Sequence, residues 1–134
     1  MTTQAAPDAQ AATPFARLGG EEGVRALVDR FYDLMDLEPE FAPLRAVHGA
    51  SLAHARDKLH LFLCGWLGGP PLYASRYGHP RLRSRHLPFP IGARERDQWV
   101  ACMARALDDA GGPDDLKAPL MEAFAGTADW MVNR

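Results

Sequence analysis

The chain has 134 residues, 47% of them hydrophobic, and a formal net charge of −2 at pH 7. That length fits one domain with a single core. The charge gives no overall indication of binding to nucleic acid or to an anionic membrane, and no apolar run approaches the length that spans a bilayer.

The first residues predict a tail ahead of the folded domain. Residues 1–14 consist mostly of Ala, Thr, Gln, Pro and Asp, a composition typical of disordered segments. We therefore expect a disordered tail over 1–14 and one domain over 15–134. No Lys or Arg precedes Arg17 and no apolar block is present, so a secretory signal is not expected and the cytoplasm is the expected location.

Apolar residues at helical spacing predict four long helices. They are expected over about 21–36, over 51–67 with Ser51 as the N-cap, from about 92 to the glycines at 111–112, and from near Pro113 onward. Prolines predict short turns over 37–50, and 72–90 is expected to be an irregular functional loop. No segment alternates like a strand, so the predicted fold class is all-α, with helix pairs packed across one another.

One histidine lies in an unusually constrained stretch, GHPRLRSRHLPFPI over 78–91. Pro88 and Pro90 exclude a regular helix just after His86, because proline lacks an N–H group and restricts the residue before it. An imidazole held in this way suits a metal ion such as iron. The alternative is a loop histidine with a structural hydrogen bond, which composition alone favours.

Three arginines alternate just before this histidine, at 81, 83 and 85. In an extended or irregular segment, alternate side chains point the same way, so Arg81, Arg83 and Arg85 could pair with an anionic group of a cofactor. The alternatives are a solvated basic surface balanced by Glu95 and Asp97 and, less favoured by the net charge, a nucleic-acid patch.

Several aromatic and histidine side chains are further candidates. Tyr32 and Trp99 carry a polar group on an aromatic ring; their spacing favours core packing, and the alternative is donation to a ligand in a cavity. His48 lies in a loop and could reach a cavity. His54 and His60 are not three or four positions apart, so we expect them to face solvent rather than to form a metal site.

The two cysteines are Cys64 and Cys102, and both fall on apolar faces of predicted helices. We expect buried thiols rather than a disulfide. The chain contains no CxxCH, HExxH, P-loop or GxSxG motif. It therefore has no signature of covalent haem attachment, of a zinc protease, of phosphate cradling or of a serine hydrolase.

Taken together, these motifs resemble the truncated haemoglobins, and within them group II. The matching segments are 19–20, 31–32, 44–48, 66–71, 78–80, 85–86 and 95–99. The most specific part is the Arg-His-x-Pro-Phe segment around His86 with Trp99 thirteen positions later. The resemblance covers about residues 15–134.

The resemblance implies a two-over-two α-helical sandwich around haem b, with His86 as the proximal iron ligand. It implies that Tyr32, Trp99 and His48 form the distal polar side. It also implies further cofactor-binding positions: Ala55, Leu59 and Phe62 on the distal wall, and Lys58, Arg85 and Tyr73 near the haem propionates. Gly49 stands where the family often has proline, so the loop around His48 is expected to be mobile.

The function implied by the resemblance is reversible binding of dioxygen for sensing or delivery, with nitric oxide, carbon monoxide and peroxide as further ligands. One alternative is an enzyme that oxidises nitric oxide or reduces peroxide with electrons from a separate reductase. Another is a haem-free helical interaction module. The residues do not determine whether the protein is a monomer or a homodimer. They also do not determine whether His48 or Tyr32 occupies the sixth iron position.

Overall fold

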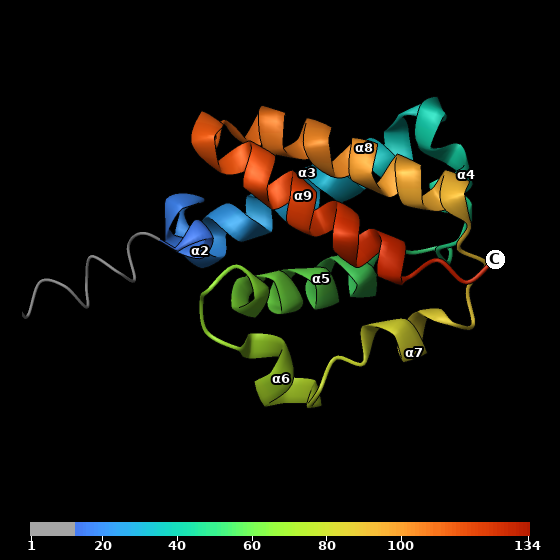
Figure 1. Ribbon diagram of the computed structural model, residues 1–134, viewed down its shortest axis with the longest axis horizontal. Coiled ribbons are helices and arrows are strands. Elements are labelled where there is room, and N and C mark those ends of the chain that lie inside the picture. Colours follow the sequence, from blue (N-terminus) through green and yellow to red (C-terminus); the bar gives the residue numbers. More distant parts are fainter. Residues whose placement is uncertain (1–12) are drawn as a thin grey trace, which may run out of the picture.

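The computed structural model describes residues 13–134, and every regular element in that range is a helix. Two pairs of long helices form the body (Figure 1). One pair is α3 (Gly20–Leu37) with α5 (Ala53–Trp66), and the other is α8 (Ala93–Ala110) with α9 (Asp114–Trp130). α3 also packs along α8 and joins the pairs. The predicted two-over-two architecture is confirmed.

Short helices connect the long ones. α2 (Pro14–Arg17) precedes α3, and Thr13 caps it by accepting a hydrogen bond from the Ala16 amide at 3.1 Å. A 3-10 helix, η2 (Pro39–Phe41), and α4 (Ala42–Ala46) follow α3. Thr13 and Pro14 therefore belong to the folded part, whereas the rest of the predicted tail lies outside the described residues.

The core uses the helix faces that the sequence predicted. The α3 side chains Val24, Leu27, Val28 and Phe31 have no exposed surface. Each such burial contributes about 1.5–3 kcal/mol to folding. Both cysteines are free and buried, as expected. Among residues 13–134 no helix has the combination of length and apolar character that a membrane span needs.

Two helix ends show how local sequence sets the boundaries. Gly111 ends α8 with a φ of 71°, a left-handed conformation that favours glycine. At the start of α5 the prediction was wrong, because Leu52 rather than Ser51 is the N-cap. The Ser51 hydroxyl accepts a hydrogen bond from the Ala53 amide at 3.2 Å instead.

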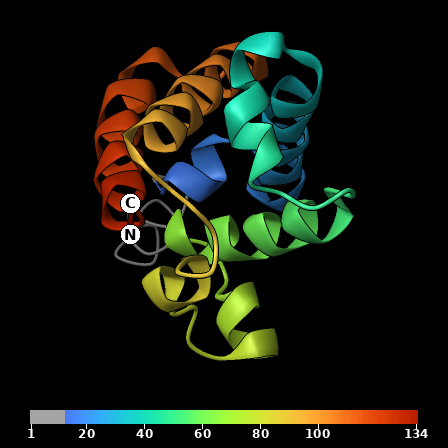
Figure 2. The same ribbon diagram turned by 90° about the vertical axis from the view of Figure 1, so that its right-hand side faces the viewer.

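The segment 72–90 is not the irregular loop that was predicted. It contains α6 (Leu72–Tyr77) and α7 (Leu82–His86), which lie on the side of α5 away from the α8 and α9 pair (Figures 1 and 2). Pro88 does stop helical structure after His86, because α7 ends there. Helices of five or six residues are too short to show a periodic apolar pattern, which is why the sequence did not indicate them.

Candidate functional site

α7 carries His86 and is positioned differently from the long helices. Within residues 13–134 it has no extensive packing contact with another helix. Figure 2 shows α7 beside α6 at the edge of the molecule, across α5 from the helical body. Its position therefore depends on individual side chains and on the segments that flank it.

The His86 imidazole has one nitrogen fixed and one available. Its Nδ1 atom lies 2.6 Å from the Leu82 carbonyl oxygen. A carbonyl can only accept, so Nδ1 is the protonated nitrogen and donates. Nε2 has no hydrogen-bond partner in the described part of the chain. This is the arrangement in which a histidine binds a metal, with the second nitrogen held by a carbonyl.

Tyr32 and Trp99 both contact a buried phenylalanine, and His48 lies against Tyr32. The Tyr32 ring, 5% exposed, meets Phe31 and His48 edge-on at centroid distances of 4.9 and 5.9 Å. Trp99 is half-buried on α8, with its ring 5.2 Å from Phe31. The structure thus gathers the three polar aromatic side chains that the family resemblance assigned to one side of the site.

The polar groups of Tyr32 and Trp99 are unusual for buried aromatic residues. Neither the Tyr32 hydroxyl nor the Trp99 indole N–H has a hydrogen-bond partner among residues 13–134. Buried groups of this kind normally find one. No polar side-chain atom of the described residues is both sealed from solvent and unpaired, so both groups face accessible space. Burial raises the pKa of Tyr32, which keeps its hydroxyl protonated as a donor.

His48 is held in a similar way to His86. Its Nδ1 atom donates to the Leu44 carbonyl at 3.0 Å. Burial lowers the pKa of His48, and the charge of Arg45 lowers it further, so the neutral imidazole is favoured.

The wall formed by α5 is apolar and only partly covered. Ala55, Leu59 and Phe62 are half-buried and pack against the edge of the core. Trp66, one turn further, stacks on Phe124 at 4.7 Å. Half-covered apolar side chains along α5 fit contact with a large, flat, apolar group.

The three residues expected near anionic groups of a cofactor differ in their surroundings. Lys58 is exposed, with Nζ 5.6 Å from the centre of the Tyr77 ring. Tyr73 is buried, and its ring meets Phe62 edge-on at 6.3 Å. Arg85 is exposed and has no ion pair among residues 13–134. The Tyr77 ring lies next to both Lys58 and Tyr73, with its centroid 5.0 Å from that of Tyr73.

The arginines before His86 do not share a direction, which corrects the prediction from their alternation. Residues 82–86 are helical, and side chains two positions apart on a helix point to opposite sides. Arg81 precedes the helix with a φ of 49°. Arg83 turns to the end of α9, where its Nη1 donates to the Trp130 carbonyl at 2.7 Å.

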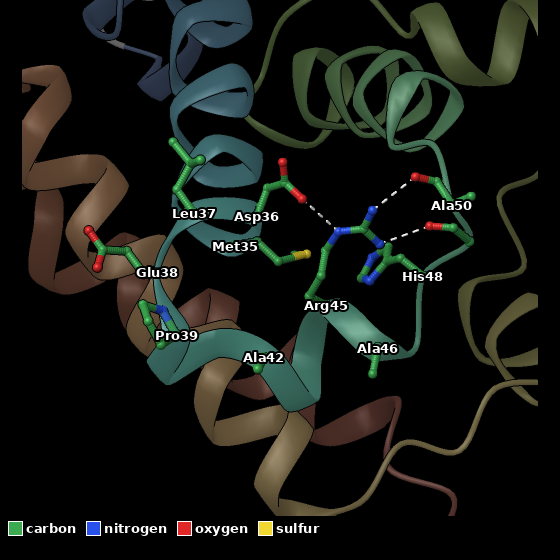
Figure 3. A pocket seen from close by; sticks show the side chains of 11 residues that line it. Met35, Asp36, Leu37, Glu38, Pro39, Ala42, Arg45, Ala46, His48 and Ala50 are labelled. Carbon is green, nitrogen blue, oxygen red and sulfur yellow. Dashed lines mark hydrogen bonds and ion pairs between the residues drawn. The ribbon is translucent and has the colours of Figure 1, made fainter.

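A pocket of about 540 Å³ lies beside the loop that carries His48 (Figure 3). His48 lines it, but Tyr32, Trp99 and His86 do not. Arg45 reaches across this region from α4 and donates to Asp36 at 3.0 Å and to two loop carbonyls, Gly49 at 2.8 Å and Ala50 at 3.0 Å. The loop that Gly49 was expected to make mobile is therefore tied down by one side chain.

Arg56 is a contact that sequence reasoning missed. From α5 it donates to the Asp29 carboxylate at 3.1 Å and to Asp33 at 2.7 Å, both on α3, and its guanidinium lies 5.8 Å from the Tyr32 ring centre. Two acidic residues four positions apart on one helix were the available signal for a basic partner.

His60 is a second correction, because it is not solvent-facing. Its ring is half-buried, and Nε2 donates to the Glu21 carbonyl at 3.0 Å. His54 is exposed, as expected.

Comparison with known proteins gives a consistent result. The model of the bacterial-like globin family matches residues 13–133. Group 2 truncated hemoglobin YjbI of Bacillus subtilis (strain 168) is 40% identical over 115 residues, which cover 86% of this chain and 85% of that protein.

Solved structures agree in fold as well as in sequence. The cold-adapted truncated hemoglobin of Pseudoalteromonas haloplanktis TAC125 has a TM-score of 0.88 at 42% identity, covering 91% of this chain and 98% of that one. The group II 2-on-2 hemoglobin of Agrobacterium tumefaciens also has a TM-score of 0.88, at 43% identity and 91% and 95% coverage. For the truncated oxygen-avid haemoglobin of Bacillus subtilis the values are 0.80, 39%, and 90% and 99%.

The fold and the histidine-centred site define a two-over-two globin. The chain belongs to the bacterial-like globin family and, within it, to the group II truncated haemoglobins. Haem is the group that this family implies. The residues present fit it in their chemistry, because His86 offers an imidazole nitrogen, α5 offers half-covered apolar side chains, and Tyr32 and Trp99 offer two donors without a partner among residues 13–134.

Proposed function

We propose that this chain holds haem b through Nε2 of His86 and binds dioxygen and other diatomic ligands reversibly. The observation that carries the proposal is the hydrogen bond from His86 Nδ1 to the Leu82 carbonyl at 2.6 Å, which leaves Nε2 as the unprotonated nitrogen. When bound, the haem supplies the ferrous iron at which a diatomic ligand coordinates. The protein supplies the orientation of the imidazole and the surroundings of the ligand.

On the distal side, Tyr32 and Trp99 donate hydrogen bonds to the ligand, with His48 as a third polar group. Both lack a partner among residues 13–134, so no hydrogen bond to that part of the chain has to break first. A hydrogen bond to a group that carries charge contributes about 1.5–3 kcal/mol. Because 1.4 kcal/mol is tenfold in a rate, each bond slows ligand dissociation by roughly ten- to a hundredfold.

The α5 side chains complete the proposed pocket. Leu59 and Phe62 exclude water from the ligand, which strengthens the hydrogen bonds, and Ala55 leaves a small opening for ligand entry. Lys58, Arg85 and Tyr73 are proposed to contact the haem propionates. Lys58 and Arg85 are exposed cations, a placement that suits carboxylates at the rim of a pocket.

Visible absorption of the protein expressed with a haem supply tests this proposal. We expect a Soret band in the unaltered chain and its loss or gross change in His86→Ala. His54→Ala is the matched control, because His54 is exposed on α5 and its loss should leave the spectrum unchanged. An unaltered iron spectrum in His86→Ala would remove His86 from the proximal position, and a chain without any Soret band would be a haem-free helical module.

The distal donors also support a second candidate, an enzyme that oxidises nitric oxide or reduces peroxide at the same site. In this candidate, Tyr32 from α3, Trp99 from α8 and His48 from the loop after α4 would assist the reaction. Turnover needs electrons from a separate reductase. Rapid mixing of the oxygen-loaded protein with nitric oxide, followed by reduction with candidate reductases, distinguishes the two candidates. An enzyme forms nitrate over many turnovers, whereas a binding protein stops after one equivalent.

A further inference from the structure

The segment after α9 lies along the segment after His86, where the two meet at the end marked C in Figure 1. Asn133 uses its whole side-chain amide there. Its Nδ2 donates to the carbonyls of His86 at 3.1 Å and Phe89 at 2.9 Å, and its Oδ1 accepts from the Ile91 amide at 3.0 Å. One side chain thus binds three backbone groups of the segment that carries the proposed iron ligand.

Further contacts join the same two segments, and we call residues 130–134 the C-terminal clamp. The amides of Asn133 and Arg134 donate to the Ile91 carbonyl at 2.8 and 3.2 Å. On the other side of α7, Arg83 donates to the Trp130 carbonyl at 2.7 Å, and its guanidinium lies 5.3 Å from the centre of the Trp130 ring. The clamp therefore holds α7 and the residues that follow it.

The local sequence cannot hold this segment by itself. A helix of five residues is far shorter than one that is stable alone. Few local amides reach its last carbonyls: Leu87 donates to Arg83 at 3.1 Å and Phe89 to His86 at 3.0 Å, and Pro88 and Pro90 provide no amide. Asn133 meets this need because an amide side chain combines two donor hydrogens with an acceptor, and it is the only asparagine in the chain.

We propose that Asn133 is a positioning residue for His86, which fixes the proximal imidazole through the carbonyls of His86 and Phe89. The inference rests on the proposed function, because it takes His86 as the iron ligand. The bond from Nδ1 to Leu82 sets the rotation of the imidazole within α7, and Asn133 sets the position of α7 relative to α9. Together they determine how the histidine is presented to the iron.

The test compares Asn133→Asp and Asn133→Ala in the haem-loaded protein. Aspartate has nearly the size of asparagine and keeps the acceptor for Ile91, but a carboxylate cannot donate to the two carbonyls. Arg134→Ala is the control, because the Arg134 side chain reaches only the Asn133 carbonyl, at 3.4 Å. The readouts are the iron–histidine stretching band in resonance Raman spectra of the ferrous protein, the rate of haem transfer to excess apomyoglobin, and amide exchange over 82–92 in the haem-free chain.

We expect the iron–histidine band to shift and broaden in both Asn133 variants, and not in Arg134→Ala. Loss of two hydrogen bonds should speed haem release roughly 5- to 100-fold, and exchange over 85–91 should be faster. An unchanged Raman band would overturn the inference, even if exchange rose, because the clamp would then be structural only. Failure of the proposed function is seen separately, in His86→Ala, which would then keep the iron spectrum of the unaltered chain.

Discussion

The two sides of the proposed haem site are held in place by different kinds of interaction. On the distal side, Tyr32 and Trp99 come from the long helices α3 and α8, with the fully buried Phe31 between them. On the proximal side, His86 ends a five-residue helix that is held mainly by hydrogen bonds to the C-terminal clamp.

This difference determines what each side can tolerate. Burial of one large apolar side chain contributes about 1.5–3 kcal/mol, whereas one hydrogen bond contributes about 0.5–1.5 kcal/mol net. The distal donors are therefore fixed by the same packing that folds the protein. The proximal histidine is fixed by several separate hydrogen bonds, each of which contributes less than one buried ring, so iron ligation and fold stability should respond to different substitutions.

The largest expected effect tests the distal side. Phe31→Ala removes a fully buried ring that contacts both distal donors, and we expect the free energy of unfolding to fall by about 3–5 kcal/mol. Phe89→Ala is the proximal match, because Phe89 is 45% exposed, and we expect a change within about 0.5 kcal/mol. Urea denaturation of the haem-free chain measures both, and similar losses would contradict the contrast between the two sides.

The next effect concerns ligand release. Trp99→Phe keeps an aromatic ring beside Phe31 and removes the indole N–H, so we expect dissociation of dioxygen to be roughly ten- to a hundredfold faster. Stopped-flow replacement of dioxygen by carbon monoxide gives the rate. Trp130→Phe is the control, because Trp130 is 61% exposed at the end of α9. A dissociation rate like that of the unaltered chain would remove Trp99 from its proposed role.

A smaller effect should depend on pH. The Gly92 amide, at 2.9 Å, and Arg94 lower the pKa of the Glu95 carboxyl, at the start of the helix that follows the clamped segment. A lowered folded pKa stabilises the protein above the unfolded value of about 4.3, and that stability is lost as the pH falls through the folded pKa.

Glu95→Gln should therefore unfold more easily by about 0.5–1 kcal/mol at pH 7, the net value of a single hydrogen bond. As the pH falls from about 5 to about 3, the difference from the unaltered chain should disappear. Denaturation of the haem-free protein at several pH values measures it. A constant difference across that range would show that the carboxylate charge is not the cause.

The smallest effect concerns the loop after α4, which carries His48 and is held by hydrogen bonds from Arg45. Arg45→Gln removes the guanidinium that binds Asp36 and the carbonyls of Gly49 and Ala50. We expect faster amide exchange over 47–52 and a loss of stability below about 1 kcal/mol, because the Asp36 side chain is 51% exposed. The iron–histidine band should not move, and a change in it would mean that the two sides are coupled.

The long helices could be predicted from the sequence, whereas the short helices on the proximal side could not. Helices of 14 to 18 residues carry several turns of apolar periodicity, so α3, α5, α8 and α9 could be read from the sequence. The same pattern placed Phe31 in the core. α6 and α7 span fewer than two turns, and the interpretation of Arg81, Arg83 and Arg85 failed because it assumed an extended backbone.

The site residues required more than periodicity. Tyr32 and Trp99 were assigned to the distal side by family resemblance, since spacing alone made them core residues. Asn133 gave no signal at all, because its partner His86 lies 47 residues earlier and hydrogen bonds to backbone carbonyls leave no trace in the sequence of the bonded segment. The roles of Tyr32, Trp99 and His86 at the haem stay predictions, and so does the cytoplasmic location.

The clamp also has a consequence for the order of events during synthesis. Ribosomes add about 5–20 residues per second, so Asn133 follows His86 by about 2–9 s at its separation of 47 residues. When His86 is made, α3 and α5 already exist as a chain, but Trp99 on α8 and the clamp on α9 do not. Haem that arrives early therefore meets an incomplete distal side and a histidine without its clamp, and secure iron ligation waits for residues 130–134.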